Sequence, residues 1–186
     1  MLLPTLALVL IHALPPGVAE LARRLAARPA FECDFVQERS LAGLRNPLKS
    51  SGTFRLEPGQ RASWIQLKPV PQTILLRRDG MELLRPDGTS QKLSASAPVA
   101  GEIARALYAM TQGDLQGLAG TFEVEWVRRK DDDWALRLSP KGIARNAFRE
   151  IVLSGAADLG AISLLDGQGL PTRIVFTSPR PLGKAP

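Results

Sequence analysis

Few residues of this 186-residue chain are of types that carry chemistry on their own. The chain has one histidine, His12, and one cysteine, Cys33. Histidine is the commonest general acid–base residue, and a nucleophilic cysteine needs a base beside it. The run Asp131-Asp132-Asp133 could bind calcium, but it lacks the alternating Asp spacing, the glycine and the closing Glu of a calcium loop. We therefore expect a solvated hairpin tip there, no metal, no cofactor and no enzyme.

The N-terminus has the layout of a secretory signal. The stretch MLLPTLALVLIHAL is almost continuously apolar and is followed by small residues, although no Lys or Arg precedes it. It is shorter than the ~20 residues that a membrane-spanning helix needs. The alternative, a buried N-terminal helix, would be broken by its prolines. We expect cleavage after Ala19, export to the periplasm, and a single domain over residues 20–186 that has lost His12.

The composition excludes further classes of protein. The chain has 24 Lys and Arg against 18 Asp and Glu, but its arginines are dispersed and form no basic stripe with exposed aromatics, so we expect no nucleic-acid binding. One cysteine allows no internal disulfide. Cys33 alternates with Phe31 and Phe35 and lies far beyond the apolar run, which favours a buried thiol over a lipidated N-terminus.

The elements that position these residues follow from periodicity. Val18, Leu21 and Leu25 share one helical face, and Pro29 ends that helix. Alternating segments follow, separated by turn residues such as Asp79-Gly80 and Asp87-Gly88. The six predicted strands are FECDFVQE, GTFRLE, ASWIQLK, QTILLRR, MELLR and SQKLSA.

A second helix is predicted after the sixth strand. Val99, Ile103, Leu107 and Met110 recur at helical spacing, and Gly113 ends the segment. Five more strands follow, in TFEVEWVRR, DDDWALRLSP, AFREIVLSG, AISLLDGQG and TRIVFTS. The sequence thus predicts a mainly β fold: an open, antiparallel half-barrel of about eleven strands, covered by helices. Its inward apolar side chains could form either a packed core or the lining of a ligand cavity.

The order of several short motifs resembles the periplasmic lipoprotein carrier family LolA. These motifs are Phe35-Val36-Gln37, Ser51-Gly52-Thr53-Phe54 before a proline turn, Trp64, Pro71-Gln72 and Asp79-Gly80. The resemblance covers most of the chain after the signal. It implies an open eleven-stranded barrel with a helical lid, which binds acyl chains of lipoproteins and carries them across the periplasm.

The resemblance also implies a set of site residues. The expected lining of the acyl-binding cavity comprises Phe35, Phe54, Leu56, Trp64, Leu75, Ile103, Leu107, Met110, Phe122 and Trp126. Glu57 occupies the position before the turn proline, where the family has an arginine that ties the lid to the barrel. Three alternatives follow: the tie is lost, it is reversed through Arg23, Arg24, Arg28 or Arg105, or Glu57 only ends a strand in solvent.

The function implied is that of a monomeric carrier of lipid or lipoprotein cargo. It would receive cargo from an inner-membrane donor protein and deliver it to an outer-membrane acceptor. The alternative is a regulatory module of the same fold that senses lipid or lipoprotein.

Overall fold

The computed structural model describes residues 16–92, 108–109, 111–128 and 133–182. Within these residues the helical elements are α1 (Pro16–Ala26), α3 (Leu115–Leu118) and the 3₁₀ helix η1 (Gly142–Asn146). The strands are β1 (Phe31–Arg39), β2 (Leu48–Glu57), β3 (Arg61–Lys68), β4 (Gln72–Arg77), β5 (Gly80–Leu84), β6 (Ser90–Lys92), β7 (Phe122–Arg128), β8 (Trp134–Pro140), β9 (Phe148–Gly155), β10 (Leu159–Asp166) and β11 (Pro171–Pro181). No helix in the described ranges has the length and apolar character needed to cross a membrane.

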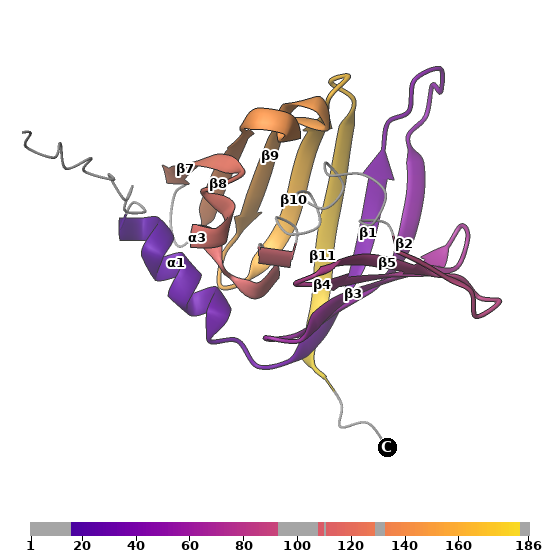
Figure 1. The fold of residues 1–186 in the computed structure, drawn as a ribbon, viewed down its shortest axis with the longest axis horizontal. Helices are drawn as coiled ribbons and strands as arrows, with labels where there is room; N and C mark the ends of the chain where they lie inside the picture. The colour runs from indigo at the N-terminus through magenta and orange to yellow at the C-terminus, as the bar shows by residue number, and fades with distance from the viewer. Residues whose placement is uncertain (1–15, 93–107, 110, 129–132, 183–186) are drawn as a thin grey trace, which may run out of the picture.

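All eleven strands form one antiparallel sheet, in the order β6-β5-β4-β3-β2-β1-β11-β10-β9-β8-β7 (Figure 1). The sheet stays open, because β6 and β7 at its two ends do not pair with each other. Pairing of β1 with β11 joins the N-terminal and C-terminal sets of strands, for example Phe35 opposite Phe176. The expected eleven-stranded open half-barrel is confirmed.

Gly52 of β2 lies close to the backbone of β3. The pairing of these strands shifts register between Ser51 and Gly52. A Cβ atom at position 52 would lie 1.9 Å from the carbonyl oxygen of Ile65, so only glycine fits. The glycine of the Ser51-Gly52-Thr53-Phe54 motif is therefore required by backbone packing.

Helix α1 packs its apolar face onto the sheet. Pro16 is the first residue of the helix and Pro29 follows its end. Proline is common at both places, because it cannot donate the backbone hydrogen bond that a helix interior needs. Val18, Leu21 and Leu25 are buried, as their spacing predicted. They join a first core with residues of α3, β7, β8 and β9. Helices α1 and α3 lie beside the half of the sheet that contains these strands (Figure 1).

A second core fills the other half of the sheet. Its buried members come from β1–β4 and β11 and are Cys33, Phe35, Phe54, Leu56, Ala62, Leu76 and Ile174. Ile162 of β10 packs against both cores. The two cores therefore lie side by side on the concave face, and the space between them is where a cavity can form.

The helical residues 111–112 end at Gly113, as the sequence predicted, with φ of 71°. A Cβ atom on Gly113 would lie 2.7 Å from the backbone nitrogen of Ala26, so this turn packs directly on the end of α1. Asp114 then caps α3 by accepting a hydrogen bond from the Gly117 amide at 2.8 Å. Of the predicted second helix, Val99, Ile103, Leu107 and Met110 lie outside the described residues.

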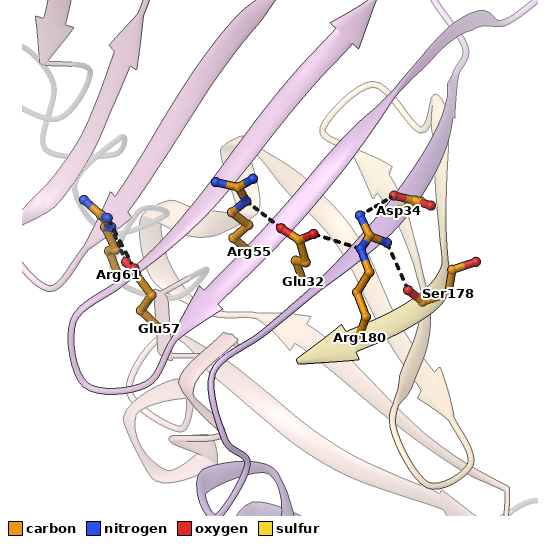
Figure 2. Close-up of polar contacts among 7 residues, drawn as sticks. All are labelled: Glu32, Asp34, Arg55, Glu57, Arg61, Ser178 and Arg180. Carbon is orange, nitrogen blue, oxygen red and sulfur yellow. Dashed lines mark hydrogen bonds and ion pairs between the residues drawn. The ribbon is translucent and has the colours of Figure 1, made fainter. Parts of the chain in front are cut away.

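Charged side chains on the opposite, convex face form an ion-pair network across three strands (Figure 2). Arg55 of β2 donates to Glu32 of β1 at 2.7 Å, and Arg180 of β11 donates to Glu32 at 2.8 Å and to Asp34 at 3.1 Å. Burial acts to raise the pKa of Glu32, but the hydrogen bonds from the two arginines outweigh it and lower that pKa. The network bridges β2, β1 and β11, where the two halves of the sheet meet.

Candidate functional site

A cavity of about 240 Å³ opens on the concave face between the two cores. Its walls come from both halves of the sheet, from the end of α1 and from the segment before Gly113. The described lining residues are Leu25, Arg28, Phe31, Cys33, Gln37, Phe54, Leu56, Trp64, Ile74, Leu76, Met81, Thr111, Trp134, Phe148, Ile151, Leu153, Leu159, Ile162, Leu164, Ile174 and Phe176. Nearly all of these side chains are apolar, so the cavity suits a hydrocarbon ligand.

One wall of the cavity is an aromatic cluster around Trp64. Its ring centroid lies 4.2 Å from that of Phe35, 5.8 Å from that of Phe54 and 5.9 Å from that of Phe176. The rings are tilted or edge-on to one another, which is the arrangement that aromatic pairs prefer. Trp64 sits over Phe35 and covers it, so Phe35 is 1% exposed while Trp64 faces the cavity.

Polar groups in the lining are few. Thr111 directs its hydroxyl to the carbonyl oxygen of Tyr108 at 2.8 Å, and Gln37 lies toward one end of β1. Burial raises the pKa of the Cys33 thiol to about 11, so this cysteine stays protonated and behaves as an apolar residue. Arg28 is the only charged residue among the described lining residues.

The structure brings three of the ten predicted lining residues to the cavity: Phe54, Leu56 and Trp64. Leu75 is buried but does not line it, since its neighbours Ile74 and Leu76 do and successive side chains of a strand point to opposite faces. Phe35 lies beneath Trp64 in the second core.

The remaining predicted residues lie elsewhere. Phe122 is a buried member of the first core, and Trp126 packs against that core and beside Gly17. Ile103, Leu107 and Met110 lie outside the described residues.

Sequence reasoning missed the contribution of the C-terminal strands. Seven lining residues come from β8, β9 and β10, namely Trp134, Phe148, Ile151, Leu153, Leu159, Ile162 and Leu164. The alternation of Trp134, Leu136 and Leu138 showed that one face of β8 was apolar. The motifs that suggested a cavity all lie in the first six strands, however, so nothing in the sequence indicated which apolar face of the later strands would meet it.

Within the described residues, Glu57 forms no ion pair or hydrogen bond with α1 or with residues 108–112. It pairs with Arg61, its cross-strand neighbour in the β2–β3 hairpin, with Arg61 Nη2 at 3.3 Å from Glu57 Oε1 (Figure 2). The candidate partners on α1 and after it contact other groups: Arg23 pairs with Glu20, Arg24 donates to the carbonyl of Ala156, and Arg28 pairs with Asp158. A reversed tie through these three arginines is therefore not formed, and Arg105 lies outside the described residues.

The hairpin tip nevertheless reaches the helical segment by another route. The Gly59 amide donates a hydrogen bond to Oε1 of Gln112 at 2.7 Å. Gln112 directly precedes Gly113, which packs on the end of α1. The turn after Glu57 is thus joined to the helical residues 111–112 by the Gly59 amide and the neutral side chain of Gln112.

The described residues contain no group of three or more His, Cys, Asp or Glu side chains that could hold a metal ion. The described lining residues offer a ligand burial of apolar surface beside the guanidinium of Arg28.

Comparison with known proteins supports the same architecture. A family model described as outer membrane lipoprotein carrier protein LolA-like matches residues 16–177. A LolA superfamily protein from Nitrosomonas europaea is 10% identical with a TM-score of 0.51, over 90% of this chain and 94% of that chain. A putative outer membrane lipoprotein-sorting protein domain from Vibrio parahaemolyticus is 10% identical with a TM-score of 0.50, over 88% of this chain and 90% of that one.

A further similar structure is the MucA/MucB complex of Pseudomonas aeruginosa, 16% identical with a TM-score of 0.51; the match covers 88% of this chain and only 56% of that chain. No curated protein sequence matches the chain. At these identities the solved structures are evidence for the fold alone. The family model, in contrast, matches most of the sequence and is evidence for the family. The fold and the family match agree with the motifs of the first strands, and the chain belongs to the outer membrane lipoprotein carrier protein LolA-like family.

Proposed function

We propose that this protein is an exported, non-enzymatic carrier that binds the acyl chains of a lipid or lipoprotein in the concave cavity. The observation that carries the proposal is the lining itself, which is apolar almost throughout and is built from both halves of an open sheet. Each methylene that leaves water contributes about 0.8 kcal/mol, so an acyl chain supplies enough binding energy without specific polar contacts.

Transport requires the cargo to leave as well as to enter. An open sheet can release a ligand from its concave face when a partner protein favours the open state. We propose that the chain works as a monomer in the periplasm, between an inner-membrane donor and an outer-membrane acceptor. An N-terminal signal would direct export and would then be removed.

The direct test is organic extraction of protein purified from its native host, with mass spectrometry of the extract. A matched pair of variants then locates the site. Leu164→Glu places a carboxylate in the cavity wall, whereas Val36→Glu adds the same charge on the other face of the sheet, where Val36 is 49% exposed. We expect the first variant to lose co-purifying lipid and the second to retain it, with circular dichroism showing both folded.

A folded Leu164→Glu variant that retains its lipid would show that the cavity is not the binding site. Absence of any lipid from the wild-type extract, together with failure to bind acyl compounds in vitro, would overturn the proposal altogether.

The second candidate is a module that senses lipid or lipoprotein. It is favoured by the likeness to MucB, whose structure in complex with MucA is known. The two candidates differ in what happens after binding: a carrier passes its lipid to acceptor membranes, whereas a sensor keeps the lipid and changes its affinity for a protein partner. Transfer of a fluorescent lipid from the loaded protein to acceptor vesicles separates them.

A further inference from the structure

Arg28 places a positive charge at a largely apolar cavity. It follows the end of α1 by two residues, and its side chain is 14% exposed. Among the described lining residues it is the only charged one. Because an unpaired guanidinium at such a site is unfavourable, an anion must accompany it.

In this structure the accompanying anion is Asp158, in the turn between β9 and β10. Arg28 Nε donates to Asp158 Oδ1 at 2.9 Å, and Nη2 contacts the same oxygen. Asp158 is 51% exposed, so its carboxylate can return to water at little cost if another anion replaces it. The pair is therefore asymmetric: the cation is fixed at the cavity and the anion is exchangeable.

Contacts on its other sides fix the position of Arg28. Its guanidinium carbon lies 4.9 Å from the centre of the Phe31 ring, which also lines the cavity. Arg24, one turn earlier on α1, donates to the carbonyl of Ala156 at 2.9 Å in the same turn. The Phe31 ring thus contacts Arg28 directly, and the bond from Arg24 holds α1 beside the same turn.

We propose that Arg28 binds the anionic head of an acyl ligand, a carboxylate or a phosphate, whose hydrocarbon chain lies in the cavity. The inference rests on the proposed function, because it requires the cavity to take acyl chains. It adds that the ligand carries its charge next to the first methylenes of the chain, and that this charge displaces Asp158 from Arg28. A guanidinium is suited to either oxyanion, since its donors can engage two oxygens at once.

The test compares ligands that share one chain and differ in the head. The purified full chain is titrated with dodecanoate, dodecyl phosphate and neutral methyl dodecanoate, by displacement of a fluorescent fatty-acid probe at pH 8. We expect at least one anionic compound to bind roughly tenfold more tightly than the ester. The anion that binds more tightly, dodecanoate or dodecyl phosphate, identifies the head as a carboxylate or a phosphate.

Three variants assign the preference to Arg28. Arg28→Gln should bind the ester as the wild type does and lose the tenfold preference for the anion. Asp158→Asn should strengthen anion binding, because it removes the competing carboxylate. Arg23→Gln is the control: Arg23 is exposed and pairs with Glu20 on α1, so its loss removes one positive charge but should leave the preference unchanged.

The outcomes separate this inference from the proposed function. If none of the three compounds binds the wild type, the acyl-carrier proposal fails. If the ester and both anions bind equally well, the carrier proposal stands and the role of Arg28 is refuted. Should Arg28→Gln fail to fold, Asp158→Asn decides, because a folded Asp158→Asn variant that binds the anions no more tightly than the wild type would also refute the role of Arg28.

Discussion

The backbone amide of Gly59, at the tip of the β2–β3 hairpin, donates a 2.7 Å hydrogen bond to the side-chain oxygen of Gln112. These residues lie 53 positions apart in the sequence. The contact joins the hairpin to the segment that packs on α1, next to the position where Glu57 pairs with Arg61. A tie between hairpin and helix thus exists without a charged residue.

Gln112→Ala should loosen this tie. Loss of the acceptor lowers the free energy of local opening around Gly59 by about 0.5–1.5 kcal/mol. Exchange of the Gly59 amide hydrogen should therefore accelerate roughly 2- to 12-fold. Hydrogen exchange followed by NMR measures it. Glu57→Gln is the matched control, since it breaks the Arg61 pair in the same hairpin but keeps the Gly59 contact. Equal protection in wild type and Gln112→Ala would show that the hydrogen bond does not hold the hairpin.

The position of the mature N-terminus should affect stability. Val18 is 0% exposed in the first core, and Gly17 lies against the ring of Trp126. Cleavage after Ala19 would remove both, so a chain that begins at Glu20 should lose about 1.5–3 kcal/mol of unfolding free energy relative to one that begins at Gly17. Urea denaturation of the two proteins measures the difference.

Sequencing the N-terminus of the exported protein shows which form the cell makes. A chain beginning at Gly17 with Val18→Ala should have intermediate stability. Identical denaturation midpoints for the two starting points would mean that Val18 contributes nothing to the fold.

Cys33 should react slowly with alkylating agents. With its pKa raised to about 11 by burial, only about one thiol in a thousand is ionised at pH 8, against about a quarter at an ordinary pKa. We expect iodoacetamide to react roughly a hundredfold more slowly with the folded protein than with the protein in denaturant. A similar rate in both states would contradict the burial of this thiol.

Glu32 should make stability depend on acid pH. Its pKa is lowered in the folded state by its arginine partners, so its contribution is present above the unfolded pKa of about 4.3 and is lost as pH falls below that value. Glu32→Gln should therefore reduce unfolding free energy by up to about 1 kcal/mol at pH 7 and by less at pH 3. Thermal unfolding at both pH values measures the loss of stability. The control is Glu123→Gln, because Glu123 is an exposed carboxylate on β7. An equal loss at both values would show that the charge of Glu32 is not responsible.

The sequence by itself determined the elements and their order. Short apolar segments, most of them alternating with polar residues, marked the eleven strands, and glycine and proline marked the turns between them. The helical spacing of Val18, Leu21 and Leu25 identified the buried face of α1, and Gly113 marked the end of the second helical segment. These features are local, because each depends on side chains a few residues apart and on backbone angles that particular residues favour.

Only the tertiary structure decided what faces the cavity. The run Ile74-Leu75-Leu76 has no alternation, so its sequence does not show which side chains point inward; pairing with β3 and β5 directs the first and third of them to the cavity. Phe35 has the spacing of a lining residue but is covered by Trp64, because the rings meet across β1 and β3.

The partners of the charged residues were likewise decided by the fold. Arg28 meets Asp158 across 130 positions of sequence, and Arg180 meets Glu32 across 148. Both contacts depend on the pairing of β1 with β11, which brings the two halves of the chain into one sheet. Local patterns specify strands, but the neighbours of a strand depend on free energy summed over the whole sheet. The cavity and the position of Arg28 beside it follow from that sum.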